Sequence, residues 1–427
     1  MNVQELYTSF KQAYPDSGDP RLFYAPGRVN LIGEHIDYNG GYVFPCALTL
    51  GTYAAICRRE DNIMRLTSAN IAPPITVTNA NLSYDAAHGW ANNPKAVTKL
   101  LIDMGHNIGG YDLYVWGNLP HNAGLSSSAS INVLVALALC TVFCVDMSMV
   151  DIAILCQRAE NEYLGVNCGI MDQFASAMGR KNHAILLKCD TLEHTYVPID
   201  MGDYKLILAN TNMPRALADS KYNERRGECE KALADIKAVS NKENLCAYEP
   251  DDFLGHARAV YGETVVNQGL RPITEAGLDP KMRGTTPETD NETVFKRAYH
   301  VVNENARVKY AVDVLNKGEL QAFGEAMTAS HMSLRDFYEV TGAGLDALVL
   351  AANELEGPSC CKGLVKTKVL GSRMTGAGFG GCTVSIVHKD SVDEFISSVG
   401  KRYTQLTGQI ADFYVAETDD GAREVWL

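Results

Sequence analysis

The chain has 427 residues, of which 46% are hydrophobic and 21% are charged, and its formal net charge at pH 7 is −13. This length exceeds the size at which one hydrophobic core usually stops growing, so we expect two domains with a cleft between them. The acidic balance argues against a nucleic-acid or anionic-membrane surface, because either would need clustered lysines and arginines.

The N-terminal segment and the cysteines both predict a cytosolic protein. Val3, Leu6, Tyr7 and Phe10 recur at helical spacing, without the charged-then-apolar plan of a signal peptide. The twelve cysteines include no C-x-x-C pair, and many lie in apolar runs, which is typical of reduced core thiols.

Residues 25–41 bring several polar side chains into a short stretch punctuated by glycines, which we expect to be a loop. It contains Arg28, Glu34, His35 and Asp37. Such a density of donors and acceptors suits a polyhydroxylated ligand. A metal site is the competing functional interpretation, although the spacing of a dedicated metal site is absent. A solvated loop whose charges pair among themselves is the plain structural alternative.

Short alternating or β-branched runs predict strands at residues 52–57, 111–116, 184–187 and 204–210, interleaved with helical patterns. A charged, helix-rich region follows from 221 to about 335, with a looser stretch near 262–287, and then a strand near 382–387. The pattern predicts an α+β protein with two α+β domains, residues 1–200 and residues 201–427.

Residues 117–130 follow a predicted strand and lead directly into an apolar helix at 131–144, whose uncharged run is too short to span a bilayer. Unpaired N–H groups at the helix start, the helix dipole and several hydroxyls would meet there, which suits a polyphosphate. Gly124 would allow close approach of the backbone, and the serines 126–128 add donors. A serine-capped buried helix is the alternative. No Walker A pattern occurs in the chain.

The best-delimited helix is predicted at residues 149–164, with Ser148 as its N-cap and Gly165 at its C-terminal cap. Glu160 falls on the flank of the buried stripe, where a ligand could reach its carboxylate without full burial. Asp172 follows in an apolar setting near the next helix start. It is either a simple cap or, beside an arginine, an ionised group able to accept a hydroxyl proton.

The glycine cluster GAGFGG at residues 376–381 formally satisfies a dinucleotide-binding pattern. The glycines run into a β-rich stretch instead of a helix, so the required context fails. A loop beside a ligand is the functional interpretation, and an inter-strand turn is the alternative.

Three motifs together resemble galactokinases, within the superfamily of galactokinase, homoserine kinase, mevalonate kinase and phosphomevalonate kinase. They are GRVNLIGEHIDY at 27–38, GLSSSA at 124–129 and GAGFGG at 376–381. The resemblance runs over essentially the whole chain. It implies a two-domain α+β fold with the active site in the interdomain cleft, and transfer of the γ-phosphoryl of Mg-ATP to the C1 hydroxyl of galactose by a monomeric cytoplasmic enzyme.

Carried over by position, the resemblance makes Asp172 the catalytic base and Arg28 its ionised partner. Mg²⁺ would be bound by Ser128 and Glu160. The sugar would be held by Glu34, His35, Asp37, Gly169 and Tyr222. The ATP phosphates would be cradled by Gly124, Leu125, Ser126, Ser127, Ser128, Ala129 and Ser130.

One departure concerns the sugar. Many galactokinases have threonine where this chain has Ile36, and the related N-acetylgalactosamine kinases can carry isoleucine there, whereas Asn39, Gly40 and Gly41 look like the galactokinase version of the loop. The alternatives are a kinase for N-acetylgalactosamine or arabinose, and a non-catalytic galactose and ATP sensor. A sensor should show damage in the catalytic motifs, and these are intact. A dinucleotide oxidoreductase rests on one weak glycine pattern alone.

Overall fold

A computed structural model of the chain describes residues 1–120, 123–213, 218–271, 290–355 and 368–427. Its strands are β1 (Arg21–Asn30), β2 (Tyr42–Val43), β3 (Pro45–Arg58), β4 (Ile63–Ser68), β5 (Ile75–Thr78), β6 (Tyr111–Gly117), β7 (His183–Lys188), β8 (His194–Pro198), β9 (Tyr204–Asn210), β10 (Val369–Met374), β11 (Cys382–His388), β12 (Asp412–Ala416) and β13 (Arg423–Val425).

The α-helices are α1 (Val3–Ala13), α2 (Asn92–Asp103), α3 (Ser127–Val142), α4 (Met149–Arg158), α5 (Met171–Met178), α6 (Ala218–Ile236), α7 (Pro250–Tyr261), α8 (Glu263–Gly269), α9 (Asn291–Asn316), α10 (Leu320–Ser333), α11 (Gly342–Asn353) and α12 (Val392–Thr407). Short 3₁₀ turns are η1 (Asp37–Asn39), η2 (Ala86–Ala91), η4 (Leu245–Ala247) and η7 (Lys389–Ser391), and π-helical turns are η3 (Ala159–Leu164) and η6 (Leu334–Tyr338). Within the described ranges, no helix combines the length and the apolar character that crossing a membrane requires.

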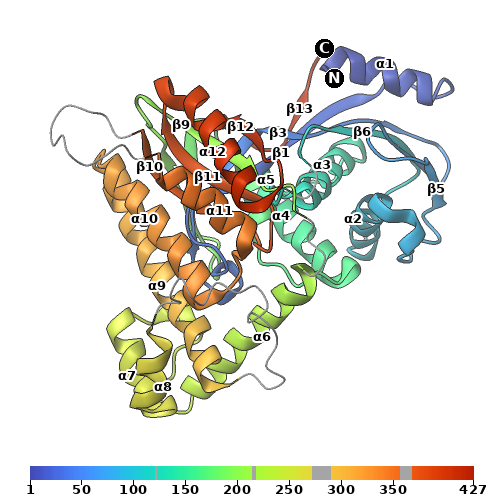
Figure 1. Cartoon of the computed structure of the whole chain (residues 1–427). Helices are drawn as coiled ribbons and strands as arrows, with labels where there is room; N and C mark the ends of the chain where they lie inside the picture. The colour runs from blue at the N-terminus through green and yellow to red at the C-terminus, as the bar shows by residue number, and fades with distance from the viewer. Residues whose placement is uncertain (121–122, 214–217, 272–289, 356–367) are drawn as a thin grey trace.

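The strands form three sheets. The first has the order β13-β1-β3-β6-β4-β5, the second β10-β11-β9-β12, and the third β2-β7-β8. All neighbouring pairs are antiparallel except β4 with β6. Because β13 pairs with β1, the end of the chain returns to the first sheet, and Figure 1 shows the two termini side by side next to α1.

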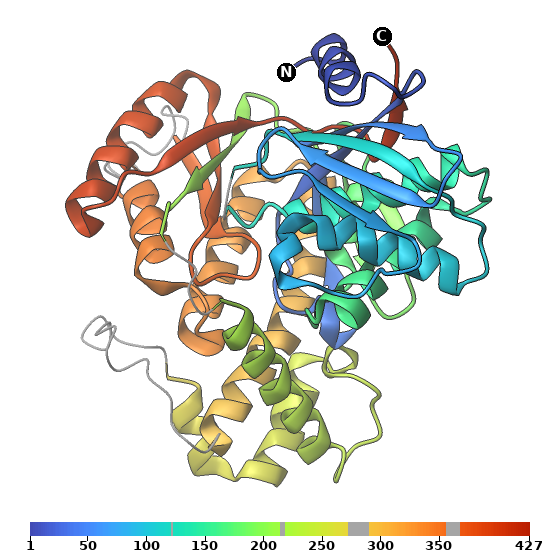
Figure 2. The same ribbon diagram turned by 90° about the vertical axis from the view of Figure 1, so that its right-hand side faces the viewer.

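Helices cover these sheets on the sides that bury apolar residues. The apolar helix α3 packs on β1 and β3, and most of its residues are buried, as its uncharged sequence predicts. Helix α10 lies against β10 and beside α9, while α11 and α12 pack together near the second sheet. In both views, α7 and α8 lie at the end of the molecule farthest from the termini (Figures 1 and 2). The main hydrophobic core contains buried residues from Phe23 to Ile386 and so includes side chains from both halves of the chain.

Most predicted elements are present, and the differences lie close to the functional motifs. The predicted strands correspond to parts of β3, β6, β7, β9 and β11. The expected loop at 25–41 is wrong in its first part, because residues 25–30 belong to β1. The strand register shifts between Pro26 and Arg28, a bulge that re-aims the following side chains. The looser stretch predicted at 262–287 contains α8, and its remainder at 272–289 lies outside the described residues.

The domain boundary near residue 200 stays a prediction. Strand β9 begins the second sheet just after that position, and β13 then leads the chain back to the first sheet.

Candidate active site

Arg28 links two segments that are far from it in sequence. It is almost fully buried, and its Nε and Nη2 atoms lie 2.8 and 2.7 Å from Oδ1 of Asp172. Its Nη1 donates to the carbonyl of Gly124 at 2.6 Å. Gly27 permits this approach, because a Cβ there would lie 2.6 Å from the carbonyl oxygen of Leu125. The arginine thus ties β1 to both the serine-rich loop and α5.

Asp172 lies in the first turn of α5, where the helix dipole favours a negative charge. Its side chain is 30% exposed, and its Oδ2 accepts a hydrogen bond of 2.5 Å from the hydroxyl of Ser126. The arginine and serine contacts hold the carboxylate in place, and its partial exposure leaves it within reach of a ligand.

Glu34 is buried and held by the glycine cluster of the C-terminal half. The N–H of Gly376 and the hydroxyl of Thr375 donate to its Oε1 at 2.7 and 3.1 Å. The Arg373 guanidinium lies 3.6 Å from the same oxygen. Burial raises the pKa of Glu34, and the charges of Arg373 and Arg28 oppose that shift. The carboxylate is therefore fixed in place before any ligand binds.

His35 has one defined tautomer. Its Nε2 lies 3.1 Å from the carbonyl of Ala377, which can only accept, so Nε2 carries the hydrogen. Burial lowers the pKa of His35 to about 3, so the ring is neutral and Nδ1 accepts from the hydroxyl of Tyr38 at 2.8 Å. Tyr338 must then donate to Tyr38 (2.7 Å), and the Cys229 thiol to Tyr338 (3.2 Å). This hydrogen-bond chain uses both ring nitrogens of His35.

Asp37 is half-buried at the start of η1. Burial, with the charges of Asp172 and Glu34, raises the pKa of Asp37 to about 7. A Cβ at Gly169 would clash with Oδ2 of Asp37, so only glycine fits there. Tyr222, on α6, lies close to the same loop. The centroid of its ring is 5.5 Å from that of His35 and 5.3 Å from that of Tyr38.

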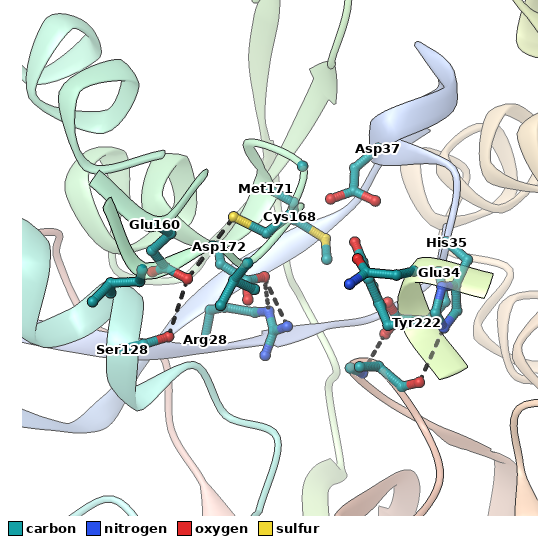
Figure 3. A pocket seen from close by; sticks show the side chains of 17 residues that line it. Arg28, Glu34, His35, Asp37, Ser128, Glu160, Cys168, Met171, Asp172 and Tyr222 are labelled. Atoms are coloured by element: carbon teal, nitrogen blue, oxygen red, sulfur yellow. Dashed lines mark hydrogen bonds and ion pairs between the residues drawn. The ribbon is translucent and has the colours of Figure 1, made fainter. Parts of the chain in front are cut away.

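These side chains line a first cavity of about 280 Å³ between segments from both halves of the chain (Figure 3). Four of its lining residues are carboxylates, and one of the described lining residues, Arg28, is cationic. The cavity is lined by Arg28, Glu34, His35, Asp37, Ser128, Glu160, Leu164, Gly165, Val166, Cys168, Gly169, Met171, Asp172, Tyr222, Asn223, Gly376 and Ala377.

A second cavity, of about 220 Å³, adjoins the first and is formed around the serine-rich loop. It shares Arg28, Ser128, Asp172 and Ala377 with the first cavity, and its other lining residues are Leu119, Pro120, Ala123, Gly124, Leu125, Ser126 and Ser127. The start of α3 opens here, so its first N–H groups lack helical partners. A third cavity, of about 240 Å³, continues past Ser127, Ser128 and Leu119 to Trp90 and Ile71.

The serine-rich loop divides into two parts. Ser126 has a left-handed backbone with φ of 61°, and Ser127 and Ser128 are exposed. Ala129 and Ser130 line none of the three cavities. The Ser130 hydroxyl is buried, 2.8 Å from both the Ala25 carbonyl and the Thr52 hydroxyl. The structure therefore does not place the side chain of Ser130 among the phosphate-binding groups.

Glu160 lies in the π-helical turn η3, not on the flank of a regular helix. Its side chain is buried, contrary to the expected half-exposed position, yet it still lines the first cavity. Its Oε2 lies 3.4 Å from the Ser128 hydroxyl, and its Oε1 accepts from Asn132 at 3.2 Å. Burial, with the charge of Asp172, raises the pKa of Glu160 to about 7. π-turns of this kind occur frequently at functional sites.

Family models match three stretches of the chain: a galactokinase galactose-binding signature over residues 8–58, the GHMP kinase N-terminal domain over 92–180, and the GHMP kinase C-terminal domain over 311–405. A galactokinase of Fusobacterium nucleatum is 46% identical over 426 residues, covering 99% of this chain and 100% of its own. The chain belongs to the galactokinase family.

Solved structures place the fold in the same family. The crystal structure of Lactococcus lactis galactokinase complexed with galactose matches with a TM-score of 0.86 and 37% identity, covering 99% of this chain and 100% of that one. The mevalonate kinase of Methanococcus jannaschii, 16% identical, covers 94% of this chain and 99% of its own with a TM-score of 0.61, which shows the shared fold. The expected two-domain α+β kinase fold is confirmed.

The sequence did not predict several residues that line the first cavity or contact its lining. Cys168 and Met171 line the first cavity from within the segment that carries Gly169 and Asp172, and Asn223 follows Tyr222 on α6. Arg373 was missed as the partner of Glu34, although an arginine in an apolar strand just before a glycine cluster was a usable signal.

Ile36 does not reach the sugar-sized cavity. Its side chain is fully buried, and a Cβ at Gly41 would lie 3.0 Å from it. It is not among the residues that line the first cavity. The departure from the common threonine therefore lies in the packing beneath the loop.

Proposed function

We propose that this protein phosphorylates galactose at its C1 hydroxyl with ATP, giving galactose 1-phosphate and ADP. One observation carries the proposal. The first and second cavities meet at Arg28 and Asp172, so that a ligand in each would face the other across this pair. The family membership supports galactose as the sugar and ATP as the co-substrate.

The sugar would occupy the first cavity, whose polar groups are already oriented. The carboxylates of Glu34 and Asp37 are acceptors for sugar hydroxyls, and Tyr222 provides a ring face and a hydroxyl. Gly169 leaves room for Asp37, and His35 holds the carbonyl of Ala377 in the wall of the cavity. These groups would set the sugar with its C1 hydroxyl toward Asp172.

Asp172 would then act as the base. As the C1 oxygen bonds to the γ-phosphorus, the bond from that phosphorus to the β–γ bridging oxygen breaks and ADP leaves. The hydroxyl proton passes to the carboxylate and later to solvent. Arg28 keeps Asp172 ionised and offsets the negative charge of the transferring phosphoryl. Positioning and charge stabilisation supply most of the rate in such transfers.

The phosphates of ATP would lie in the second cavity, against residues 124–128. The free N–H groups at the start of α3 and the exposed hydroxyls of Ser127 and Ser128 suit an anion. The base and ribose would extend into the third cavity, where Trp90 offers an aromatic surface.

Mg²⁺ would be held by Ser128 and Glu160. No group of three or more His, Cys, Asp or Glu side chains suited to a metal occurs in the described ranges. Two protein oxygens fit Mg²⁺ nevertheless, because this ion takes one or two protein ligands and completes its shell with phosphates and water. When bound, it would supply charge neutralisation for the phosphates, which would lie next to the carboxylates of the first cavity.

The deciding experiment measures ADP release by the purified protein with Mg-ATP and, in parallel, galactose, N-acetylgalactosamine, arabinose, glucose and mevalonate. We expect turnover with galactose and a product that NMR identifies as galactose 1-phosphate. Turnover with another sugar alone would overturn the substrate assignment, and galactose binding without ADP release would replace the enzyme by a sensor.

A further inference from the structure

Two separate elements hold the carboxylate of Asp172, and each engages a different oxygen. Nε and Nη2 of Arg28 both approach Oδ1, at 2.8 and 2.7 Å (Figure 3). The hydroxyl of Ser126, 46 residues earlier in the chain, donates to Oδ2 at 2.5 Å. The arginine therefore does not take the parallel arrangement in which its two nitrogens bind two oxygens.

This arrangement leaves an acceptor position on Oδ2 of the carboxylate. An ionised carboxylate offers about four lone pairs. Among the described contacts, Nε of Arg28 donates to Oδ1, with Nη2 in ion-pair contact with the same oxygen, and Ser126 donates to Oδ2. Oδ2 therefore keeps a second lone pair, and Asp172 lines both the first and the second cavity. The direction in which it points depends on where Ser126 holds Oδ2.

The backbone conformation of Ser126 indicates that its hydroxyl binds Asp172 in preference to capping its own helix. Ser126 is the N-cap of α3, but its side chain makes no capping hydrogen bond, and its φ and ψ are 61° and 52°. A serine N-cap ordinarily has an extended backbone and binds the N–H groups of its own helix. Left-handed conformations of non-glycine residues persist where surrounding contacts enforce them, often at functional sites.

We propose that Ser126 is a positioning residue for the base: it fixes Oδ2 of Asp172 so that its free lone pair meets the sugar hydroxyl. The inference rests on the proposed kinase function. Without the hydroxyl, the Arg28 fork can take the parallel two-oxygen arrangement, which turns Oδ2 toward the guanidinium and away from the substrate. The competing role is phosphate binding alone, which Ser127 would share.

The first test replaces the hydroxyl without straining the backbone. Ser126→Gly suits the left-handed conformation, and Ser126→Ala removes the same hydroxyl if the glycine variant folds poorly. We expect kcat to fall about 10- to 100-fold in both, with KM for galactose and ATP changed less than about threefold. The matched control is Ser127→Ala, in the same loop but without a contact to Asp172, for which KM for ATP should rise instead.

A double-mutant cycle separates positioning from phosphate binding. In the Asp172→Asn background, Ser126→Gly should lower kcat less than about twofold further, because its target is already lost. Equal losses in both backgrounds, or a Ser126→Gly variant that only raises KM for ATP, would overturn the inference. A wild-type protein with no galactose-dependent ADP release would instead refute the proposed function.

Discussion

The first cavity is built from buried groups that already have partners, whereas the second is built from exposed hydroxyls and a helix start. Glu34 and His35 are each fixed by groups of the glycine cluster more than 340 residues away in the chain. Ser127 and Ser128 face solvent, and Ser128 has one long contact, to Glu160.

This difference matches what each ligand would require. A sugar is distinguished from its isomers by the direction of single hydroxyls, so its acceptors gain from being fixed in advance. A polyphosphate carries a large charge and is held by dipoles, N–H groups and a cation, which tolerate variation in position. Arg28 and Asp172 line both cavities, so the groups fixed in advance for the sugar and the exposed groups for the phosphates adjoin at this pair.

The largest effect is expected from changing the group at this junction. Asp172→Asn should lower kcat at least about 100-fold, because the amide cannot accept the hydroxyl proton. Binding of galactose and of ATP, measured by calorimetry, should stay within a few-fold of wild type. Near-normal turnover would remove Asp172 from the role of base and would leave the two cavities without a shared chemical step.

Glu160 offers a test of the Mg²⁺ site through pH. Its pKa of about 7 means that it takes up a proton as pH falls through 7, and a protonated carboxyl is a poor ligand for Mg²⁺. The Mg²⁺ concentration for half-maximal turnover should therefore rise by up to about tenfold between pH 8 and pH 6. Glu160→Gln should raise that concentration about 10-fold or more and remove its pH dependence; an unchanged Mg²⁺ requirement would exclude Glu160 as a ligand.

Rising pH, which should favour Mg²⁺ binding by Glu160, should lower the contribution of Glu160 to the stability of the folded protein. Its pKa is higher in the folded protein than the usual carboxyl value of about 4.3. The folded state then binds the proton more tightly, so this contribution to stability is lost as pH rises through about 4.3 to 7. At pH 8 without Mg²⁺, Glu160→Gln should increase the free energy of unfolding by on the order of 1–3 kcal/mol in denaturant titrations. A less stable variant would contradict this.

Tyr338 tests whether the fixed partners of the first cavity matter for the sugar. Tyr338→Phe removes the donor to Tyr38 and so loosens His35 and Ala377. KM for galactose should rise about 3- to 10-fold with kcat nearly unchanged. Tyr111→Phe is the matched control, because it also loses a buried hydroxyl contact, to Thr98, and neither residue lines any of the three cavities. Equal kinetics for the two variants would mean that the hydrogen-bond chain from Tyr338 to His35 supports the fold and has no role in sugar binding.

Local patterns predicted much of this architecture, and long-range contacts limited the rest. The apolar run of α3 and the cap of α4 by Ser148 depend on residues a few positions apart, and both are present. The loop predicted over residues 25–30 is part of strand β1, because pairing with β3 outweighs its glycine and proline. No sequence spacing could reveal that Tyr338 meets Tyr38, 300 residues earlier.

The serine-rich loop shows the same limit within one motif. Adjacent serines look alike in sequence, but helix geometry turns successive side chains by roughly 100°, so they face different surroundings. Ser128 therefore lies beside the cavities, whereas Ser130 is turned inward between β1 and β3. A sequence motif marks the loop without separating its binding members from its packing members.

Ser130→Ala would test this separation, and its effect on turnover should be the smallest of those considered. The variant leaves the Ala25 carbonyl and the Thr52 hydroxyl without their buried partner, so the free energy of unfolding should fall by about 1–2 kcal/mol. KM for ATP should remain within about twofold of wild type, while Ser127→Ala should raise it about 3- to 10-fold. If Ser130→Ala raised KM for ATP as much as Ser127→Ala, the division of the loop into binding and packing serines would be wrong. Because both variants lose one hydroxyl from the same loop, the contrast isolates the direction in which each side chain points.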